Sequence, residues 1–588
     1  TIRDGGTAVA EAEGEVSEAI DFATYYARCL ETPGLEGAVP NGRGIVVVVP
    51  PWNFPYAIPA SGILAGLMAG NAVILKPAPE AVLTGWKLAQ HFWRAGVPRE
   101  VLQFVPCPDN EIGQSLVGDP RVSIVVLTGA YATGKMFQGW RPEMSLFAET
   151  SGKNALIVTA AADQDLAVKD LVRSAFGHAG QKCSAASLAI LEAEVYDSPA
   201  FRRQLRDAAA SLKVGSAWDP KSSVTPVILE PEGALRRGLT KLDEGEEWLL
   251  EPRMVDGNPQ LWSPGIKLGV TPDSNFHRAE CFGPVLGLMR AKNLREAISL
   301  QNDSEFALTG GIHTLDAREI ALWRDAVEVG NAYVNRPITG AIVRRQPFGG
   351  WKHSSFGPGA KAGGPNYVFN FGTWQTEALS KRREAPNFVT NKLLSQFKRL
   401  VIEAEERERL QVGAWSYGWA LEHEFEAEHD PSQLYGEANI FRYRPRRQIL
   451  LRCNDSADLC EVMLAILAAT ACELEGEISL APKHAKVICP AMEDVVTPRI
   501  VEESEADLIG RLGQLAPAPE LLRYLGEVPL AAYEQANAWH VPVVDDPVLG
   551  IGRLELRYYF REQSISETLH RYGNLIDPPA EDSDRITA

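Results

Sequence analysis

The sequence predicts an α/β protein built from doubly wound domains, and three observations support this. Runs of apolar, often β-branched residues alternate with stretches of helical spacing along most of the chain. The runs are apolar on both faces, as in parallel strands that are covered by helices on both sides. The chain has 588 residues, of which 45% are hydrophobic and 23% charged, so it is long enough for several domains with their own cores.

The alternation of elements begins near residue 44. The run GIVVVVP (44–50) predicts a strand, SGILAGLMAG (61–70) a helix, and NAVILKPAP (71–79) a second strand. The runs VLQFVP (101–106) and VSIVVLTG (122–129) continue the pattern. A first doubly wound domain is therefore expected up to about residue 150.

The pattern continues after Ser151 and ends in a glycine-rich segment. ALIVTAA (155–161) predicts a strand and DLAVKDLVRSAFGHAG (165–180) a helix. The segment QPFGGWKHSSFGPGAKAGGPN (346–366) predicts ordered loops beside a site, because glycine lets the backbone approach a ligand closely. Composition and charge change at LSKRREAPN (379–387), and a domain boundary is placed there.

The last 200 residues repeat the opening pattern. Residues 446–482 predict a strand, a helix and a strand with lengths similar to those of residues 42–78. Any βαβ unit would align about as well, so the similarity alone does not establish an internal repeat. The tail PPAEDSDRITA (578–588) is expected to be disordered.

Charge and cysteine usage exclude several functional classes. A net charge of −18, without a basic run, argues against a nucleic-acid partner. The eight cysteines form no CxxC pairs, so neither a zinc site nor a disulfide framework is expected, no metal is predicted, and a cytoplasmic location fits best. The longest apolar runs are too short for a transmembrane helix, and residues 1–15 are not typical of a signal peptide.

One cysteine lies in an unusual setting. Cys183 is part of GHAGQKCSAAS (177–187), a run of small residues. An isolated cysteine is most often a small buried hydrophobe. Here, however, Glu149 lies in the turn AETSGKN, and Asn53 follows a predicted strand end, where ligands bind in open α/β sheets. A thiol, a carboxylate and an amide are the groups that thioester chemistry requires.

Seven short motifs occur in a fixed order, and together they resemble the aldehyde dehydrogenase superfamily. Within it, NRPITGAIVRRQPFGG (335–350) and the GPGAKAGGPNY that follows resemble the L-glutamate-γ-semialdehyde (Δ1-pyrroline-5-carboxylate) dehydrogenases, and most closely that half of the long bifunctional proline utilization A proteins. Any one motif would be weak, whereas seven in order are specific. The motifs are PWNFP (51–55), KPA (76–78), LTG (127–129), ETSGKN (149–154), GQKCS (180–184), ECFGP (280–284) and PFGG (347–350).

The resemblance implies a division of the chain. Residues 1–150 would form a dinucleotide-binding domain with part of an oligomerisation segment, incomplete at its N-terminus, and residues 151–378 the catalytic domain. Residues 385–588 would form an aldehyde-dehydrogenase-like domain without catalysis. We also expect a homo-oligomer and a longer natural polypeptide with an upstream proline dehydrogenase (FAD) domain.

The resemblance also implies catalytic roles, each of which has a chemical reason. Cys183 would be the nucleophile that adds to the aldehyde carbon as a thiolate. The Asn53 amide and the Cys183 backbone N–H would stabilise the oxyanion, a task worth about 3–4 kcal/mol per donor. Glu149 would deprotonate the water that hydrolyses the thioester.

The implied cofactor is NAD, although the glycine pattern is not the GxGxxG fingerprint. Two departures from the family pattern weaken the choice of NAD over NADP. The sequence PAPE makes the ribose-binding acid either Glu80, displaced by one position, or absent, and Ala130 replaces a common serine. The cofactor-binding residues implied are Trp52, Lys76, Glu80, Thr128, Gly129, Glu280 and Phe282.

The implied substrate is L-glutamate-γ-semialdehyde, a small molecule whose carboxylate needs an anion site remote from Cys183. Ser184 and the backbone N–H groups of Gly340 and Ala341 would bind that carboxylate, and Phe54 and Phe348 would enclose the aliphatic carbons. Core packing is the alternative for the two phenylalanines. Another carboxylated aldehyde, such as succinic semialdehyde, and a non-catalytic scaffold with a vestigial site are the alternative functions.

Overall fold

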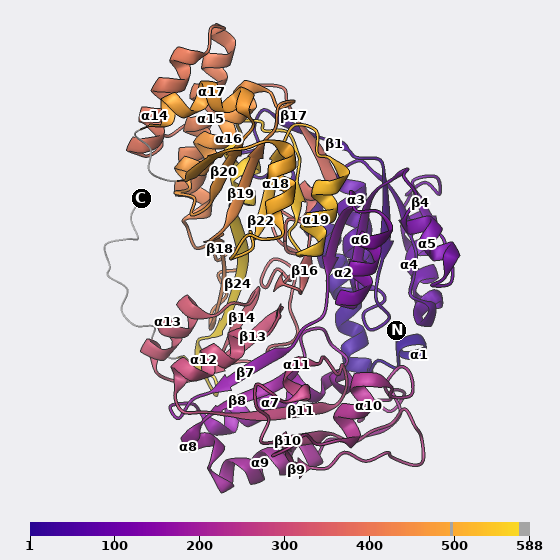
Figure 1. Ribbon diagram of the computed structural model, residues 1–588. Helices are drawn as coiled ribbons and strands as arrows, with labels where there is room; N and C mark the ends of the chain where they lie inside the picture. Colours follow the sequence, from indigo (N-terminus) through magenta and orange to yellow (C-terminus); the bar gives the residue numbers. More distant parts are fainter. Residues whose placement is uncertain (494–497, 576–588) are drawn as a thin grey trace.

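The computed structural model describes residues 1–493 and 498–575 and contains three α/β units arranged around a central junction. In Figure 1 the N-terminal unit is on the right, the middle unit at the bottom and the C-terminal unit at the top. The α/β class that the sequence predicts is confirmed. The tail expected to be disordered begins at residue 578 and lies outside the described residues.

The N-terminal unit is built on a six-stranded sheet of order β16-β6-β5-β2-β3-β4, and β2 to β6 are parallel. The strand β2 reads IVVVV and is buried along most of its length, as a strand covered on both faces must be. Its strands are β2 (Ile45–Val49), β3 (Ala72–Leu75), β4 (Leu102–Phe104), β5 (Val122–Thr128), β6 (Ser145–Glu149) and β16 (Ser355–Phe356). Its helices are α1 (Ile2–Gly5), α2 (Val9–Cys29), α3 (Ala57–Met68), α4 (Val82–Arg94), α5 (Glu111–Val117) and α6 (Tyr131–Trp140).

The middle unit is built on a nine-stranded sheet of order β18-β24-β14-β13-β7-β8-β11-β10-β9. Strands from residues 151–378 are β7 (Asn154–Val158), β8 (Ala186–Glu192), β9 (Glu247–Leu250), β10 (Gly265–Leu268), β11 (Val285–Ala291), β13 (Thr309–His313) and β14 (Asn331–Val334). The helices are α7 (Gln164–Phe176), α8 (Ala193–Tyr196), α9 (Pro199–Ala210), α10 (Gly233–Thr240), α11 (Asn275–Arg278), α12 (Leu294–Asn302) and α13 (Ala317–Ala326). Two short ribbons pair β12 (Phe306–Ala307) with β15 (Trp351–Lys352) and β1 (Ala38–Gly42) with β17 (Gly372–Thr376).

The C-terminal unit has a five-stranded parallel sheet of order β21-β20-β19-β22-β23. Its central helix α16 is buried on all sides, which explains its almost wholly apolar sequence. The strands are β19 (Ile449–Cys453), β20 (Glu477–Leu480), β21 (Arg499–Glu502), β22 (Leu521–Leu525) and β23 (Val543–Val544). The helices are α14 (Phe388–Leu400), α15 (Ala404–Ala420), α16 (Leu459–Ala471), α17 (Pro482–Ile488), α18 (Glu505–Leu512), α19 (Leu530–Ala538) and α20 (Gly552–Glu555).

The sheets do not follow the boundaries expected at residues 150, 378 and 385, because some strands of one segment pair within the sheet of another. The strands β18 (Glu437–Pro445) and β24 (Phe560–Thr568) belong to the C-terminal segment but extend the middle sheet, where β24 pairs in parallel with β14. Figure 1 shows β24 running from the upper unit into the lower one. The short strand β16 likewise leaves the catalytic segment and pairs with β6. The reason is that an edge strand leaves backbone groups unpaired until another strand covers it. A last ribbon is formed by β25 (His570–Arg571) and β26 (Asn574–Leu575).

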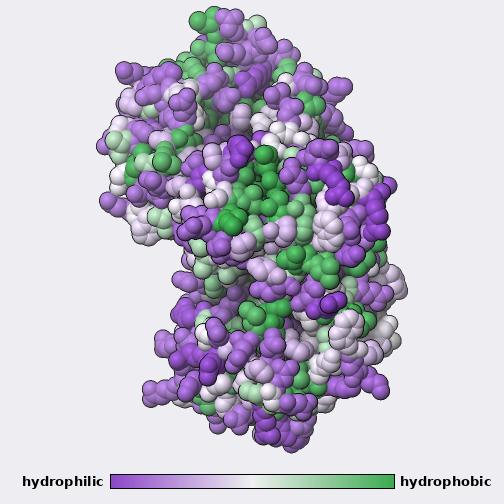
Figure 2. Space-filling view, turned by 90° about the vertical axis from the view of Figure 1, so that its right-hand side faces the viewer, coloured by the Kyte–Doolittle hydropathy of each residue, from purple (hydrophilic) through white to green (hydrophobic). Residues whose placement is uncertain are grey.

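The surface is mainly hydrophilic on the face that carries the N-terminal unit, although hydrophobic side chains gather near its middle (Figure 2). Within the described part of the chain, every helix is too short or too polar to cross a membrane.

Candidate active site

A strained turn presents Cys183 to the interior. The short helix Gly177–Gly180 precedes the cysteine, and His178, Ala179 and Gly180 all have positive φ angles of 52°, 53° and 70°. Gly180 is required there, because a Cβ atom would lie 2.2 Å from the Gly283 carbonyl oxygen. Backbone strain of this kind is held in place by surrounding structure and is frequent at functional sites.

Glu149 is the carboxylate that contacts this cysteine. It is the last residue of β6, in register with Thr128 at the end of β5, and a side-chain hydrogen bond joins it to Cys183. Burial raises the pKa of Glu149 to about 7, and the Lys361 ammonium opposes this shift. Burial and the neighbouring Glu149 raise the pKa of the Cys183 thiol well above its usual value. The resting pair is therefore a thiol beside a base that can accept its proton.

Asn53 approaches the same point from the end of β2. Its side chain is buried, and Nδ2 donates a hydrogen bond to the Gln181 carbonyl oxygen over 2.9 Å. This bond holds the Asn53 amide near Cys183, because Gln181 lies only two residues before Cys183 in the chain. The predicted triad of Cys183, Glu149 and Asn53 thus comes together from three separate segments.

A cavity of about 850 Å³ lies on one side of the pair, at the carboxyl edge of the N-terminal sheet. Its volume and its position in an open α/β sheet are typical of a dinucleotide site. Cys183 and Glu149 also line this cavity. It brings together all seven residues predicted to bind the cofactor, namely Trp52, Lys76, Glu80, Thr128, Gly129, Glu280 and Phe282.

The polar groups of this cavity are held in defined positions. The buried Lys76 pairs with Asp109, a residue of the cavity wall that the sequence analysis did not identify. Glu280 accepts a hydrogen bond from the Gly152 backbone N–H over 2.8 Å, and burial raises its pKa. The ring of Phe282 meets that of Trp52 edge to face at 5.9 Å.

A second cavity, of about 420 Å³, lies on the other side of Cys183 and Glu149. Its wall is largely apolar, and the carboxyl groups of Glu15 and Glu18 of α2 add a polar region. Burial raises the pKa of Glu15 to about 7 and that of Glu18 to about 8. The cavity is lined by all five residues predicted to bind the substrate, namely Phe54, Ser184, Gly340, Ala341 and Phe348.

The structure adds residues that the sequence analysis did not identify. The buried Gln346 accepts a hydrogen bond from Ile342 N over 3.0 Å and donates to Asn439 and Ser566 of the C-terminal segment. The loop that carries Gly340 and Ala341 is therefore tied to β18 and β24. A buried lysine, Lys361, opposes the rise in the pKa of Glu149 that burial causes. The lysine in GAKAGG could have been singled out from the sequence, whereas its partners in the C-terminal segment could not.

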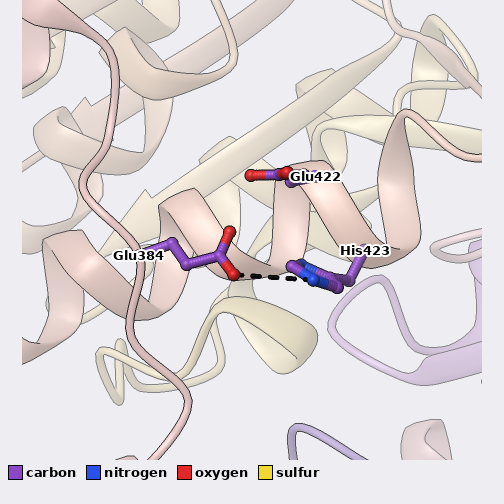
Figure 3. Close-up of side chains that lie close together, drawn as sticks. All are labelled: Glu384, Glu422 and His423. Atoms are coloured by element: carbon purple, nitrogen blue, oxygen red, sulfur yellow. Dashed lines mark ion pairs between the residues drawn. The ribbon is translucent and has the colours of Figure 1, made fainter. Parts of the chain in front are cut away.

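One cluster of potential metal-ligating groups lies away from both cavities. It consists of Glu384, Glu422 and His423, whose ligand atoms lie within 4.8 Å of one another. Figure 3 shows the ion pair between Glu384 and His423, which spans 3.5 Å. The His423 ring also stacks on Trp419. These contacts account for the cluster as a polar surface contact between the helical turn Leu421–Phe425, which follows α15, and the loop before α14.

A thiol paired with a carboxylate between a dinucleotide-sized cavity and a smaller one is typical of enzymes that oxidise aldehydes through a cysteine. The model of the aldehyde dehydrogenase family matches residues 1–376. The chain belongs to this family and is an enzyme of this kind.

Comparisons with individual relatives and solved structures show which members of the family the chain resembles. A 1-pyrroline-5-carboxylate dehydrogenase from Staphylococcus haemolyticus is 37% identical over 388 residues, which cover 61% of this chain and 73% of that protein. Proline Utilization A from Corynebacterium freiburgense is 42% identical with a TM-score of 0.85, and the similarity covers 97% of this chain and 55% of that longer chain. A structure of 1-pyrroline-5-carboxylate dehydrogenase from Thermus with bound NAD is 34% identical with a TM-score of 0.58, covering 63% of this chain and 75% of that one.

Proposed function

We propose that the chain oxidises L-glutamate-γ-semialdehyde, the open form of Δ1-pyrroline-5-carboxylate, to L-glutamate with NAD. The observation that carries the proposal is the hydrogen-bonded pair of Cys183 and Glu149, which lines both cavities. Because this pair faces both cavities, an aldehyde that enters from one cavity can bond to Cys183, and the resulting adduct then lies next to a dinucleotide in the other cavity. The names of the relatives support the choice of aldehyde.

The residues of the chain would act in sequence. Glu149 takes the proton of Cys183, and the thiolate adds to the aldehyde carbon. The Asn53 amide donates a hydrogen bond to the resulting oxyanion, a contact that is stronger in the transition state than in the aldehyde. The bound dinucleotide supplies the hydride acceptor. Glu149, again as a carboxylate, then deprotonates the water that hydrolyses the Cys183 thioester.

The first cavity suits NAD in its donor set. Glu280 and Lys76 present a carboxylate and an ammonium, the groups that bind ribose hydroxyls, while Thr128 and Gly129 offer a strand end for the pyrophosphate. Glu80 lines the same cavity despite its shifted position, and a carboxylate beside the ribose would repel the extra phosphate of NADP. These features and the NAD-bound relative support NAD over NADP.

The second cavity suits an amino acid that carries an aldehyde at its far end. Gly340 and Ala341 can present backbone N–H groups and Ser184 a hydroxyl to a carboxylate, while the carboxyl oxygens of Glu15 and Glu18 can accept hydrogen bonds from an ammonium. Succinic semialdehyde has no ammonium and would leave the acidic wall without a partner. This difference favours L-glutamate-γ-semialdehyde over the alternative aldehyde.

Rates with the two aldehydes test the proposal. With NAD, we expect kcat/KM for Δ1-pyrroline-5-carboxylate to exceed that for succinic semialdehyde by at least tenfold, which corresponds to about 1.4 kcal/mol. The same assay with NADP should give the lower rate. A preference for succinic semialdehyde would contradict the proposed substrate. Inactivity with both aldehydes would favour the alternative of a non-catalytic scaffold with a vestigial site.

We also propose that the chain works with a proline-oxidising flavin domain and as a homo-oligomer. The support is the similarity to Proline Utilization A over nearly the whole chain, combined with the longer length of that protein. Adding a proline dehydrogenase to the assay should produce glutamate from proline. Light scattering of the purified chain should give a mass of at least twice 64.3 kDa.

A further inference from the structure

The end of helix α19 in the C-terminal unit contacts helix α6 of the N-terminal unit, and Figure 1 shows the two helices side by side. Asn537 Oδ1 accepts a hydrogen bond from Gln138 Nε2 over 2.9 Å, and Asn537 Nδ2 donates to the Pro142 carbonyl oxygen over 2.8 Å. The backbone carbonyl oxygen of Asn537 accepts a bond from the Lys135 ammonium, as is favourable at a helix C-terminus. One residue of the C-terminal unit is thus bonded to α6 and to the segment that follows it.

His540 follows in a backbone conformation that favours glycine. Its φ angle is 58°. Its N–H donates to the Asn537 carbonyl oxygen over 3.2 Å, and the N–H of Val541 donates to that of Ala536 over 2.8 Å, so α19 ends in a Schellman turn. Glycine is the usual residue at this position, because a side chain there is sterically strained. The strain indicates that the imidazole ring has a role at this point.

The His540 ring lies in a cluster of aromatic side chains beside the first turn of α6. It meets the rings of Tyr131, His353 and Phe356 edge to face, at centroid distances of 5.3, 4.8 and 4.6 Å. Burial lowers the pKa of His540 to about 4, so the ring is neutral at pH 7. Its single N–H is on Nε2, which donates to the Lys352 carbonyl oxygen over 3.1 Å. The ring therefore joins the start of α6 to the loop that carries Lys352.

Both contacts hold parts of the cofactor cavity from outside. The residues of α6 that line this cavity are Thr133, Met136, Phe137 and Trp140. Thr150 also lines it, and its hydroxyl donates to the His353 carbonyl oxygen over 2.6 Å, so the loop that His540 contacts is bonded to the cavity wall. Neither Asn537 nor His540 lines the cavity itself.

We propose that Asn537 and His540 are positioning residues for the dinucleotide: they hold α6 in place at the cofactor cavity, and the C-terminal unit thereby raises the affinity for NAD. The proposal rests on the assignment of this cavity to NAD under Proposed function. If α6 occupies the binding-competent position in only a fraction of the molecules, the apparent Kd rises in inverse proportion to that fraction. The C-terminal unit then contributes to cofactor binding through α6.

Calorimetric titration of the full chain with NAD tests the proposal. Asn537→Ala removes the side-chain hydrogen bonds to Gln138 and Pro142, and Kd for NAD should rise about fivefold, as for the net loss of one hydrogen bond. His540→Gly removes the ring but suits the positive φ angle, so Kd should rise by a similar factor while the turn is kept. A merely structural role would lower the melting temperature or the number of binding sites per chain without changing Kd.

Trp539→Ala is the matched control. Trp539 lies in the same turn, but its indole nitrogen lies 2.6 Å from where a Cβ on Gly513 of the C-terminal unit would be. This variant should keep the original Kd for NAD. In Asn537→Ala, KM for the aldehyde at saturating NAD should also stay constant, because no residue of α6 lines the second cavity.

Hydrogen exchange of the unchanged chain gives a second test that needs no variant. Coupling between two sites is reciprocal, so saturating NAD should slow exchange at the hydrogen-bonded amides of His540 and Val541. The amides of α17, in the same unit, should exchange at the same rate with and without NAD.

Each outcome has a distinct meaning. An original Kd in both Asn537→Ala and His540→Gly would overturn the proposal, as would an equal rise in Trp539→Ala. If the variants do not fold, unchanged exchange at His540 and Val541 on addition of NAD would overturn it. Failure of the unchanged chain to bind NAD would instead contradict the proposed function.

Discussion

The N-terminal and C-terminal sheets share one topology but differ at the edge where ligands bind. Their strand orders are β6-β5-β2-β3-β4 and β23-β22-β19-β20-β21, so each sheet changes direction beside its first strand. In open α/β sheets a ligand binds outside the carboxyl ends of the strands at that point. The similarity of residues 42–78 and 446–482 therefore extends to the whole arrangement of strands.

The two crevices differ in how much space their loops leave at the edge of the sheet. Between β2 and β5, residues such as Trp52 and Gly129 line a cavity of about 850 Å³. Between β19 and β22, Asn454 N donates to the Leu525 carbonyl oxygen over 3.2 Å, and Asn454 Oδ1 lies 2.0 Å from where a Cβ on Gly526 would be. The loops thus contact each other where a pyrophosphate would lie. The comparison shows that the loops, and not the sheet topology, make a dinucleotide site.

If the C-terminal region carried chemistry of its own, oxidation would survive the loss of Cys183. We expect Cys183→Ala to lower kcat by at least about 10⁴-fold, because the thiolate forms the covalent intermediate. Formation of the reduced dinucleotide measures this, and calorimetry should show nearly unchanged NAD binding. Cys489→Ala, in the C-terminal region, is the control and should keep the full rate. Turnover in Cys183→Ala would remove the mechanism.

A buried carboxylate at a strand end should be needed for turnover in the N-terminal sheet and should not be needed in the C-terminal sheet. Glu149→Gln should lower kcat by about 10²–10⁴-fold, since water is no longer deprotonated and the thioester accumulates. A burst of reduced dinucleotide followed by an acyl adduct on Cys183, seen by mass spectrometry, would show this. Glu503→Gln, after β21, should leave turnover unchanged. Steady turnover of Glu149→Gln at the original rate would exclude the assignment.

The closed C-terminal crevice predicts one NAD site per chain. Lys76→Ala should weaken NAD binding by about 10- to 100-fold, the effect of losing one charge-assisted hydrogen bond. Asn454→Ala, at the same edge of the other sheet, should not change the affinity. Calorimetry gives both affinity and stoichiometry. Two equivalents of NAD bound per chain would contradict the comparison.

The C-terminal region should act on substrate binding only through its strands β18 and β24. Gln346→Ala removes the hydrogen bonds to Ile342, Asn439 and Ser566, and KM for the aldehyde should rise about fivefold, in line with about 1 kcal/mol for a lost hydrogen bond. Ser504→Ala removes the cap of α18, far from the loop, and should lower the melting temperature while KM stays constant. Equal KM values in both variants would show that the anchor loop does not depend on β18 and β24.

Short motifs determined much of the catalytic half. Asn53, Glu149 and Cys183 each lie in a local pattern, and each pattern follows a strand end or a glycine-rich turn that the sequence also predicts. Glu80 could be considered for the cofactor site for the same reason, despite its shifted position. The α/β class followed from apolar runs, since strands buried on both faces have no alternative composition.

Tertiary structure alone decided how the C-terminal region joins the enzyme. Nothing in FREQSISET indicates that β24 pairs with β14 instead of the five-stranded sheet, because backbone pairing is available at the edge of either sheet. The bond from Lys361 to Glu562 joins residues 201 positions apart. Local patterns carry no information on such a contact, since it exists only once the two segments are packed together in the assembled fold.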